Sequence, residues 1–422
     1  MKRTRPEGMR AFTLIWLGQI VSLVGSAMTW FAFTLWAWQK TGQPTALSTI
    51  SFFTFLPTVL FTPVAGALVD RWNRKRVMML SDASAALGTL AALILYLTGR
   101  LQIWHLYLIG VLAGFFMAFQ YPAYQAAVTT MLPERHYARA QGMLGLASAL
   151  SGILAPVLAA ALLGVMDMAG IMLIDLATFG AALTTLLVVS IPQPAVSAAG
   201  REGRGSLGRE ILFGFGYIRR NAALRGLTSL FVFANFFLAI AATLMAPLVL
   251  SGSGESRAAL ASVQSVGAVG GVVGGALLSV WGGFRRRVRN VLWGGIGACL
   301  LGVLTLGLGK SVLVWAVGSF FFSFFEPFVE GGNMALWQAR VEADVQGRVF
   351  SARHLLVQIP YLLGVLVSGP LAEYGLGGLA GGAAGIRLAV VLAAAGGLSA
   401  FAGGAACRAV RQAEEIFRGE PS

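Results

Sequence analysis

The chain has 422 residues, of which 57% are hydrophobic and only 11% are charged, and its formal net charge is +14. A soluble domain has about a quarter of its residues charged, so this composition excludes a soluble globular protein. The hydrocarbon core of a bilayer, ~30 Å thick, needs about 20 apolar residues for each helical crossing. The sequence therefore predicts an all-α polytopic membrane protein.

Twelve apolar segments long enough to cross a membrane follow one another, six in each half of the chain. The predicted spans are 11–37, 45–69, 77–98, 104–131, 140–165 and 169–190, then 223–250, 258–282, 288–309, 312–338, 350–371 and 384–406. The first is too long for the apolar region of a secretory signal, so we expect a retained helix. The predicted domains are an N-terminal six-helix bundle at 1–190, a C-terminal six-helix bundle at 223–406 and a cytoplasmic tail at 407–422.

The stretch 191–222 between the two halves has the Pro, Gly and charged residues of a flexible cytoplasmic linker. Within it, apolar residues recur on one helical face, namely Leu207, Ile211, Leu212, Phe215 and Ile218. This spacing predicts an amphipathic helix over 207–220 that lies on the inner membrane surface; a linker that merely joins the bundles is the alternative. A second glycine-rich stretch, 375–385, is expected to be an outer loop.

Positive charge is distributed unevenly between the connections. Of the 31 Lys and Arg residues, those in predicted outer loops are Lys40, Arg100, Arg257, Lys310 and Arg387. The other 26 fall in the termini, the inner loops and the linker or at the inner ends of the spans, which is the distribution that the positive-inside rule predicts for two cytoplasmic termini. Anionic membrane lipids are therefore the expected partner of this charge, and nucleic acid is not.

The loop after the second span joins a carboxylate to a basic run. It comprises Gly66–Arg71, which includes Asp70, followed by Arg74–Arg76. Half a chain length later, Gly275–Leu277 repeats its Gly-Ala-Leu and Arg285–Arg287 repeats its basic run. An internal repeat of this kind is how many secondary transporters are built.

Each residue type in this loop has a physical use. Gly66 permits close contact between helices, Asp70 offers a carboxylate at the membrane face, and the cations Arg71, Arg74, Lys75 and Arg76 suit anionic headgroups. The basic run could also be a topology signal only.

The pattern Gly-x-Leu-x-Asp-Arg-x-x-Arg-Lys-Arg resembles the signature loop of the major facilitator superfamily. That resemblance implies two six-helix bundles and an Asp that latches an inner gate against the N-terminal end of the eleventh helix. This helix should begin near Val349, so we expect Asp70 to pair with Arg353 or with Arg74. In the second copy Ser279 and Val280 replace the charge pair, which predicts a one-sided latch.

The fifth span contains a second motif. Its segment Gly152-Ile-Leu-Ala155-Pro156-Val-Leu-Ala159-Ala160 resembles the Gly-x-x-x-Gly-Pro-x-x-Gly-Gly motif of antiporters in this superfamily, with alanines in place of three glycines. The resemblance implies export, and small residues would let helices that rock against each other pack closely. Tight packing without a moving role is the alternative.

Two carboxylates near the middle of the tenth span are the candidate proton-coupling residues. Glu326 and Glu330 are one turn apart on the same face, and two neighbouring carboxylates in a low dielectric do not both ionise easily. Either could instead pair with a nearby cation, and the candidates for that pairing are Arg353, His354 and Arg340. Asp82 and Asp175 lie nearer the membrane faces, and a structural role is expected for both.

In the superfamily the first, fourth, seventh and tenth helices line the central cavity. The resemblance therefore implies as substrate-binding candidates Gln19, Gln120, Tyr124, Gln125, Asn235 and Asn333. Tyr and Gln side chains beside abundant Phe suit a large amphipathic substrate rather than a sugar. Drug-proton antiporters of the superfamily often carry an Arg in the fourth helix, which is absent here, so coupling is expected to be organised differently.

Motifs of other functional classes are missing. There is no Walker loop, the glycine clusters follow no strand, and the three His and two Cys residues have no ligand spacing. We expect no cofactor, no metal and no enzymatic activity. The expected partners are a small amphipathic substrate, protons and anionic lipids, and the chain is expected to work as a monomer.

Three segments narrow the resemblance to the drug:proton antiporter branch with the macrolide efflux proteins and the enterobactin exporter. They are Trp16–Gln19, Asp70–Trp72 and Leu173–Phe179. This implies a bacterial inner-membrane (plasma-membrane) protein that exports a drug or secondary metabolite by alternating access and proton antiport. One alternative is a lysophospholipid transporter or flippase, in which Asp175 would serve a headgroup path. Another is a non-transporting scaffold or receptor, which would need neither gate halves nor buried carboxylates.

Overall fold

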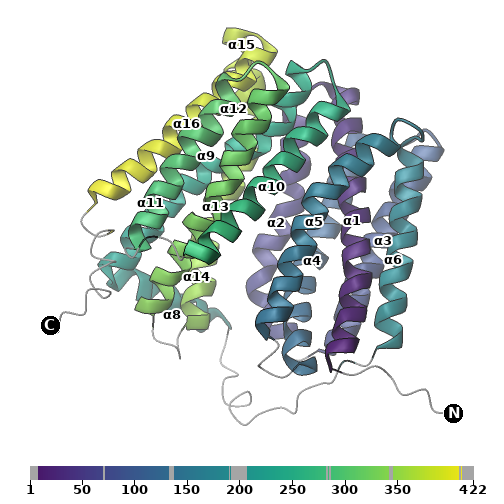
Figure 1. Cartoon of the computed structure of the whole chain (residues 1–422), viewed down its shortest axis with the longest axis horizontal. Coiled ribbons are helices and arrows are strands. Elements are labelled where there is room, and N and C mark those ends of the chain that lie inside the picture. Colours follow the sequence, from purple (N-terminus) through teal and green to yellow (C-terminus); the bar gives the residue numbers. More distant parts are fainter. Residues whose placement is uncertain are drawn as a thin grey trace. The chain divides into compact units, whose positions relative to one another are not determined.

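The computed structural model describes residues 8–69, 72–132, 137–189, 191, 207–281, 284, 287–341, 346–407 and 410. These ranges form helices throughout (Figure 1), and twelve of the helical segments are long and apolar enough to cross a membrane. The predicted all-α polytopic fold with twelve spans is thereby confirmed. Contacts divide the chain into two compact units, residues 1–40 with 50–204 and residues 41–49 with 205–422.

The first unit contains the first six spans, except for residues 41–49 at the connection of the first two. Its helices are α1 (Gly8–Thr41), α2 (Pro44–Val69), α3 (Arg74–Leu97), α4 (Ile103–Met131), α5 (Tyr137–Leu162) and α6 (Met168–Val188). The hydrophobicity of these segments predicts that they cross the membrane. Capping side chains mark where two of the helices begin. Asn73 and Asp167 accept backbone N–H groups at the starts of α3 and α6.

Small residues bring the helices of the first unit close together. Gly25 of α1 faces Thr178 of α6 so closely that a side chain at position 25 would collide with it. In α4, Gly114 packs against the α2 backbone, and the Thr58 hydroxyl donates a hydrogen bond to the Gly114 carbonyl at 2.9 Å. Close approach of this kind is the usual basis of helix association in a membrane.

The second unit contains the other six spans and the connecting helix. It comprises α8 (Leu207–Arg220), α9 (Ala222–Gly252), α10 (Arg257–Trp281), α11 (Arg287–Gly297) with η2 (Ala298–Val303) and α12 (Leu304–Leu308), α13 (Val312–Arg340), α14 (Gln346–Pro370), η3 (Leu371–Gly375), α15 (Gly377–Ala380) and α16 (Gly382–Ala406). The ninth span is thus a helix with a π turn, η2, in its middle.

Glycines also bring α10 against α13, which lie side by side in Figure 1. A Cβ on Gly270 or Gly274 would collide with the α13 backbone at Phe320 or Phe324, whereas Gly271 has ordinary clearance from Ser323. Gly270 and Gly274 therefore face α13 at a distance that only glycine permits.

The amphipathic helix predicted over 207–220 is present as α8, with the same bounds. Its Ile218 is buried, and Phe215 and Tyr217 pack against the core of the second unit, while Phe213 is exposed. The helix therefore places part of its apolar face on protein rather than on a membrane surface.

The stretch 375–385 was expected to be an outer loop, and that expectation is wrong. The structure forms the short helix α15 over Gly377–Ala380, and α16 begins at Gly382. Gly381 makes the break between them with φ of +85°, a conformation that side chains rarely adopt. The other glycines of the stretch leave helical hydrogen bonding intact.

Candidate functional site

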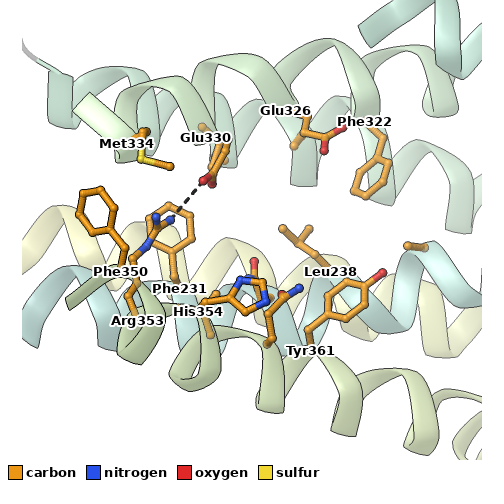
Figure 2. A pocket seen from close by; sticks show the side chains of 17 residues that line it. Phe231, Leu238, Phe322, Glu326, Glu330, Met334, Phe350, Arg353, His354 and Tyr361 are labelled. Atoms are coloured by element: carbon orange, nitrogen blue, oxygen red, sulfur yellow. Dashed lines mark hydrogen bonds and ion pairs between the residues drawn. The ribbon is translucent and has the colours of Figure 1, made fainter. Parts of the chain in front are cut away.

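The second unit contains a cavity of about 600 Å³ between four of its spans. Its walls are mostly apolar and come from α9, α11 with η2, α13 and α14, including Phe231, Leu238, Phe322, Met334, Phe350 and Val357. The polar side chains on its walls are Asn235, Glu326, Glu330, Arg353, His354, Gln358 and Tyr361. Figure 2 shows the carboxylates projecting from α13 toward the cation and ring groups of α14. A volume of this size suits a small organic ligand.

An ion pair links α13 to α14 on one side of the cavity. The Arg353 guanidinium lies 3.2 Å from Glu330 Oε1, and it stacks 5.3 Å from the centre of the Trp337 ring. The Arg353 side chain is only 11% exposed, whereas that of Glu330 is 55% exposed. Both residues line the cavity, and the arginine is the more deeply buried member of the pair. This is one of the alternative pairings that the sequence left open.

Glu326, one turn away on α13, is in a different situation. It is exposed to the same cavity, and no cation lies within salt-bridge distance of it among the described residues. The cavity thus presents one carboxylate whose charge is compensated and one whose charge is not. An uncompensated carboxylate in an apolar-walled site can hold either a proton or an organic cation.

Two of the predicted substrate-binding residues belong to the second unit and lie in different places. Asn235 of α9 is part of the cavity wall. Asn333 of α13 is fully buried, and its Nδ2 donates to Glu330 Oε2 at 3.3 Å, so it supports the carboxylate from behind. Its own oxygen has no hydrogen-bond partner.

Two predicted substrate-binding residues, Gln19 of α1 and Gln120 of α4, contact a carboxylate that was not predicted to belong to the site. Gln19 and Gln120 each donate a hydrogen bond of 2.8 Å to Asp82 of α3, one to each carboxylate oxygen. Asp82 is 5% exposed. The only sequence signal for this cluster was a carboxylate inside an apolar span, and nothing in the sequence indicated which helices would surround it.

Tyr124 lies one turn beyond Gln120 on α4, with its ring 6.5 Å from that of Phe12. Its buried hydroxyl has no hydrogen-bond partner. The side chain of Gln125, another predicted binding residue, lies outside the described part of the chain.

The signature loop is only partly described. Asp70 and Arg71 lie outside the described residues, as do the surroundings of Gly66, so the predicted pair of Asp70 with Arg353 or Arg74 stays a prediction. Trp72 stacks on Phe119 of α4, with centroids 6.0 Å apart and rings at 16°.

Two residues of the basic run of this loop are buried or hydrogen-bonded within the first unit. Arg74 is buried, and Lys75 Nζ donates to the carbonyl oxygens of Leu187 and Val189 at the end of α6. These two cations therefore differ from the headgroup-facing residues that the sequence suggested. Arg76 remains exposed.

The antiporter-like motif of α5 packs against α1. Pro156 lies inside the helix, and Ala155 and Ala159 are fully buried. Ser151, five residues before the proline, occupies the first position of the motif in place of Gly152, and its hydroxyl donates to the Leu23 carbonyl at 3.3 Å. The small residues therefore serve a close helix contact.

Twelve spans and a ligand-sized cavity with ionisable walls inside one six-helix unit define a multi-pass membrane protein that can hold a small molecule. The model of the Major Facilitator Superfamily matches residues 15–365, and the chain belongs to that family, whose members are transporters rather than enzymes. It is a protein of the bacterial inner membrane.

Among known proteins, the chain is similar to macrolide efflux protein A of Streptococcus pyogenes. The two are 26% identical over 370 residues, which cover 86% of this chain and 89% of the relative. In fold it is similar to the nucleoside transporter NupG, with a TM-score of 0.68, 12% identity and coverage of 93% and 99% of the two chains. A bacterial homologue of the iron transporter ferroportin, in an inward-facing state, gives a TM-score of 0.66 at 15% identity, with the same coverage.

Proposed function

We propose that the protein exports amphipathic small molecules by alternating access, in exchange for protons. The observation that carries this proposal is the contrast between two carboxylates of one cavity. Glu330 is paired with Arg353 at 3.2 Å, whereas Glu326 has no cation beside it among the described residues. Similarity to a macrolide efflux protein over most of the chain supports a drug-like substrate.

Glu326 is the group on which proton and substrate compete. When it is ionised, the carboxylate attracts a cationic amine whose apolar body contacts the aromatic walls of the cavity. When it takes up a proton, this attraction is lost and the substrate dissociates. The ion pair beside it keeps a second negative charge from adding to the first, so one proton is enough to change the charge of the site.

Among the alternatives, a lipid transporter needs a polar path for the headgroup, and Asp175 was the candidate for it. That residue is only 1% exposed and accepts hydrogen bonds from Thr89 and Ser26 inside the first unit. Nothing in its surroundings favours a headgroup path. A scaffold, in turn, has no use for an uncompensated carboxylate in a cavity.

The test uses purified protein in proteoliposomes with an imposed pH gradient and a radiolabelled macrolide as the probe. Glu326→Gln should abolish the part of uptake that the gradient drives, because the side chain can no longer exchange a proton. Glu255→Gln, which changes an exposed turn residue outside the spans, is the matched control and should behave as the unmodified protein does. Uptake that ignores the gradient in the unmodified protein would refute proton exchange.

The signature loop is proposed to gate this site through Asp70, Arg71 and Arg74. Asp70→Asn removes the charge and keeps the shape, so it should increase labelling of an engineered inner-facing thiol by a membrane-impermeant reagent. Arg76→Gln, at an exposed position of the same loop, is the comparison variant. Equal labelling of Asp70→Asn and the parent protein would contradict the proposed gate.

A further inference from the structure

A second carboxyl group is buried in the first unit, apart from the cavity already described. Asp175 of α6 is 1% exposed. The Thr89 hydroxyl of α3 donates to its Oδ2 at 3.0 Å, and the Ser26 hydroxyl of α1 donates to its Oδ1 at 3.2 Å. Three membrane-spanning helices therefore meet at this one carboxyl group.

Among the residues that the structure describes, no cation compensates its charge. The titratable and charged residues on the helices around it are Arg10 and Lys40 of α1, Arg74, Lys75, Arg76, Asp82 and Tyr96 of α3, Tyr137 and Arg139 of α5, and Asp167 at the start of α6. None forms an ion pair with Asp175 among the described residues. Lys75 binds carbonyl oxygens near the end of α6, and Arg10 and Lys40 lie near the ends of α1. A buried carboxyl group without a cation is most stable when it carries a proton.

The polar neighbours suit a group that gains and loses a proton. A hydroxyl donates to an ionised carboxylate and accepts from a protonated one. Thr29, three residues beyond Ser26 on α1, is 2% exposed and interacts with the same carboxyl group, although no atom of the described residues lies in full hydrogen-bonding geometry to its hydroxyl. It is the available acceptor for a protonated Asp175. Asp82 differs in its partners, because amide N–H groups, which cannot accept a hydrogen bond, donate to both of its oxygens.

The Asp175 carboxyl group lies at a close helix contact. A Cβ at Gly25 would collide with the Thr178 hydroxyl and would lie 3.2 Å from Asp175 Oδ1. The described residues hold no group of three or more His, Cys, Asp and Glu side chains that could bind a metal ion.

We propose that Asp175 is a second proton-binding site of this transporter, located at the α1, α3 and α6 contact of the first unit. The proposal rests on the proposed proton exchange and adds a site for it outside α13. A proton on one Asp175 oxygen ends the hydroxyl donation to that oxygen and creates a donation to Thr29. Proton binding would thereby change the hydrogen bonds between α1, α3 and α6.

The experiment records pH-difference infrared spectra of the reconstituted protein in the absence of substrate. Asp175→Asn should remove a titrating carboxylic-acid C=O band, because the amide keeps the size and the acceptor oxygen but binds no proton. Asp167→Asn, a change at the exposed N-cap of the same helix, should keep the band, and so should Glu326→Gln. A band that survives Asp175→Asn unchanged overturns the proposal.

A second variant keeps the proposal testable if Asp175→Asn does not fold. Thr29→Val removes the acceptor and leaves the carboxyl group, so the band should titrate at a shifted pH, whereas Thr29→Ser should restore the parent titration. No shift in Thr29→Val would contradict the proposed acceptor. A band that moves when Na⁺ replaces choline would contradict a site for protons alone.

Transport separates this proposal from the proposed function. If protons and substrate are exchanged, Asp175→Asn should lower the number of protons moved per substrate, while Asp167→Asn leaves it unchanged. If the unmodified protein ignores a pH gradient, proton exchange fails, and the infrared band still decides whether Asp175 binds a proton. An unchanged proton-to-substrate ratio in Asp175→Asn would make this residue purely structural.

Discussion

At the scale of single residues, Arg353 organises one side of the candidate site. Its guanidinium has the Trp337 ring on one side and the Glu330 carboxylate 3.2 Å away. A planar cation suits both contacts, which a lysine could not make together. Because the carboxylate is half exposed, the pair contributes little to stability by itself.

This arrangement predicts a particular pattern of stability. Arg353→Gln leaves Glu330 without a cation, so it should lower the melting temperature more than the double variant Glu330→Gln with Arg353→Gln. We expect a coupling energy of about 1 kcal/mol from the double-mutant cycle. The measurement is thermal unfolding in detergent. A coupling energy of zero would show that the pair is formed without energetic consequence.

The sequence predicted which carboxylates belong to this site, but not which residues contact them. Glu326 and Glu330 were predictable because carboxylates inside an apolar span are costly. The contact between Glu330 and Arg353 could only be offered as one of several pairings, since the two residues come from different helices. The same reason hid Asp82 as the partner of Gln19 and Gln120, because these three residues lie on α3, α1 and α4.

At the scale of helices, hydropathy predicted the membrane-spanning segments, and glycines permit the close contacts between them. Hydropathy adds up along a segment, so each span could be located without its neighbours. The π turn η2 and the short helix α15 could not be predicted in this way, because both depend on how a helix is packed at one end or in its middle. The glycines of α10 were visible as a pattern, but only the structure separates those that touch α13 from those that do not.

This separation gives a matched pair of variants on α10. Gly274→Ala places a methyl group against the Phe324 carbonyl, so it should destabilise the second unit by about 1–3 kcal/mol. Gly271→Ala has a clearance of 3.7 Å from the Ser323 carbonyl and should be close to neutral. Thermal unfolding of the two purified variants decides the matter, and equal melting temperatures would contradict the close contact.

At the scale of the whole molecule, the two units treat their carboxylates differently. The first unit buries Asp82 and Asp175 among amide and hydroxyl donors, at 5% and 1% exposure. The second unit leaves Glu326 and Glu330 exposed to a cavity, and among the described residues a cation pairs with Glu330 alone. Repetition in the sequence predicted two bundles, but it could not predict this difference, because the repeated stretches do not include these carboxylates.

The central claim is that substrate and protons move in opposite directions through Glu326. The most direct test loads proteoliposomes with a pH-sensitive dye and adds a macrolide outside, with no gradient imposed. Substrate entry through the unmodified protein should make the lumen more alkaline, because protons leave as the substrate enters. Glu326→Gln should show no pH change, and Glu255→Gln should match the parent. Substrate entry without any change of lumenal pH in the unmodified protein would contradict the account.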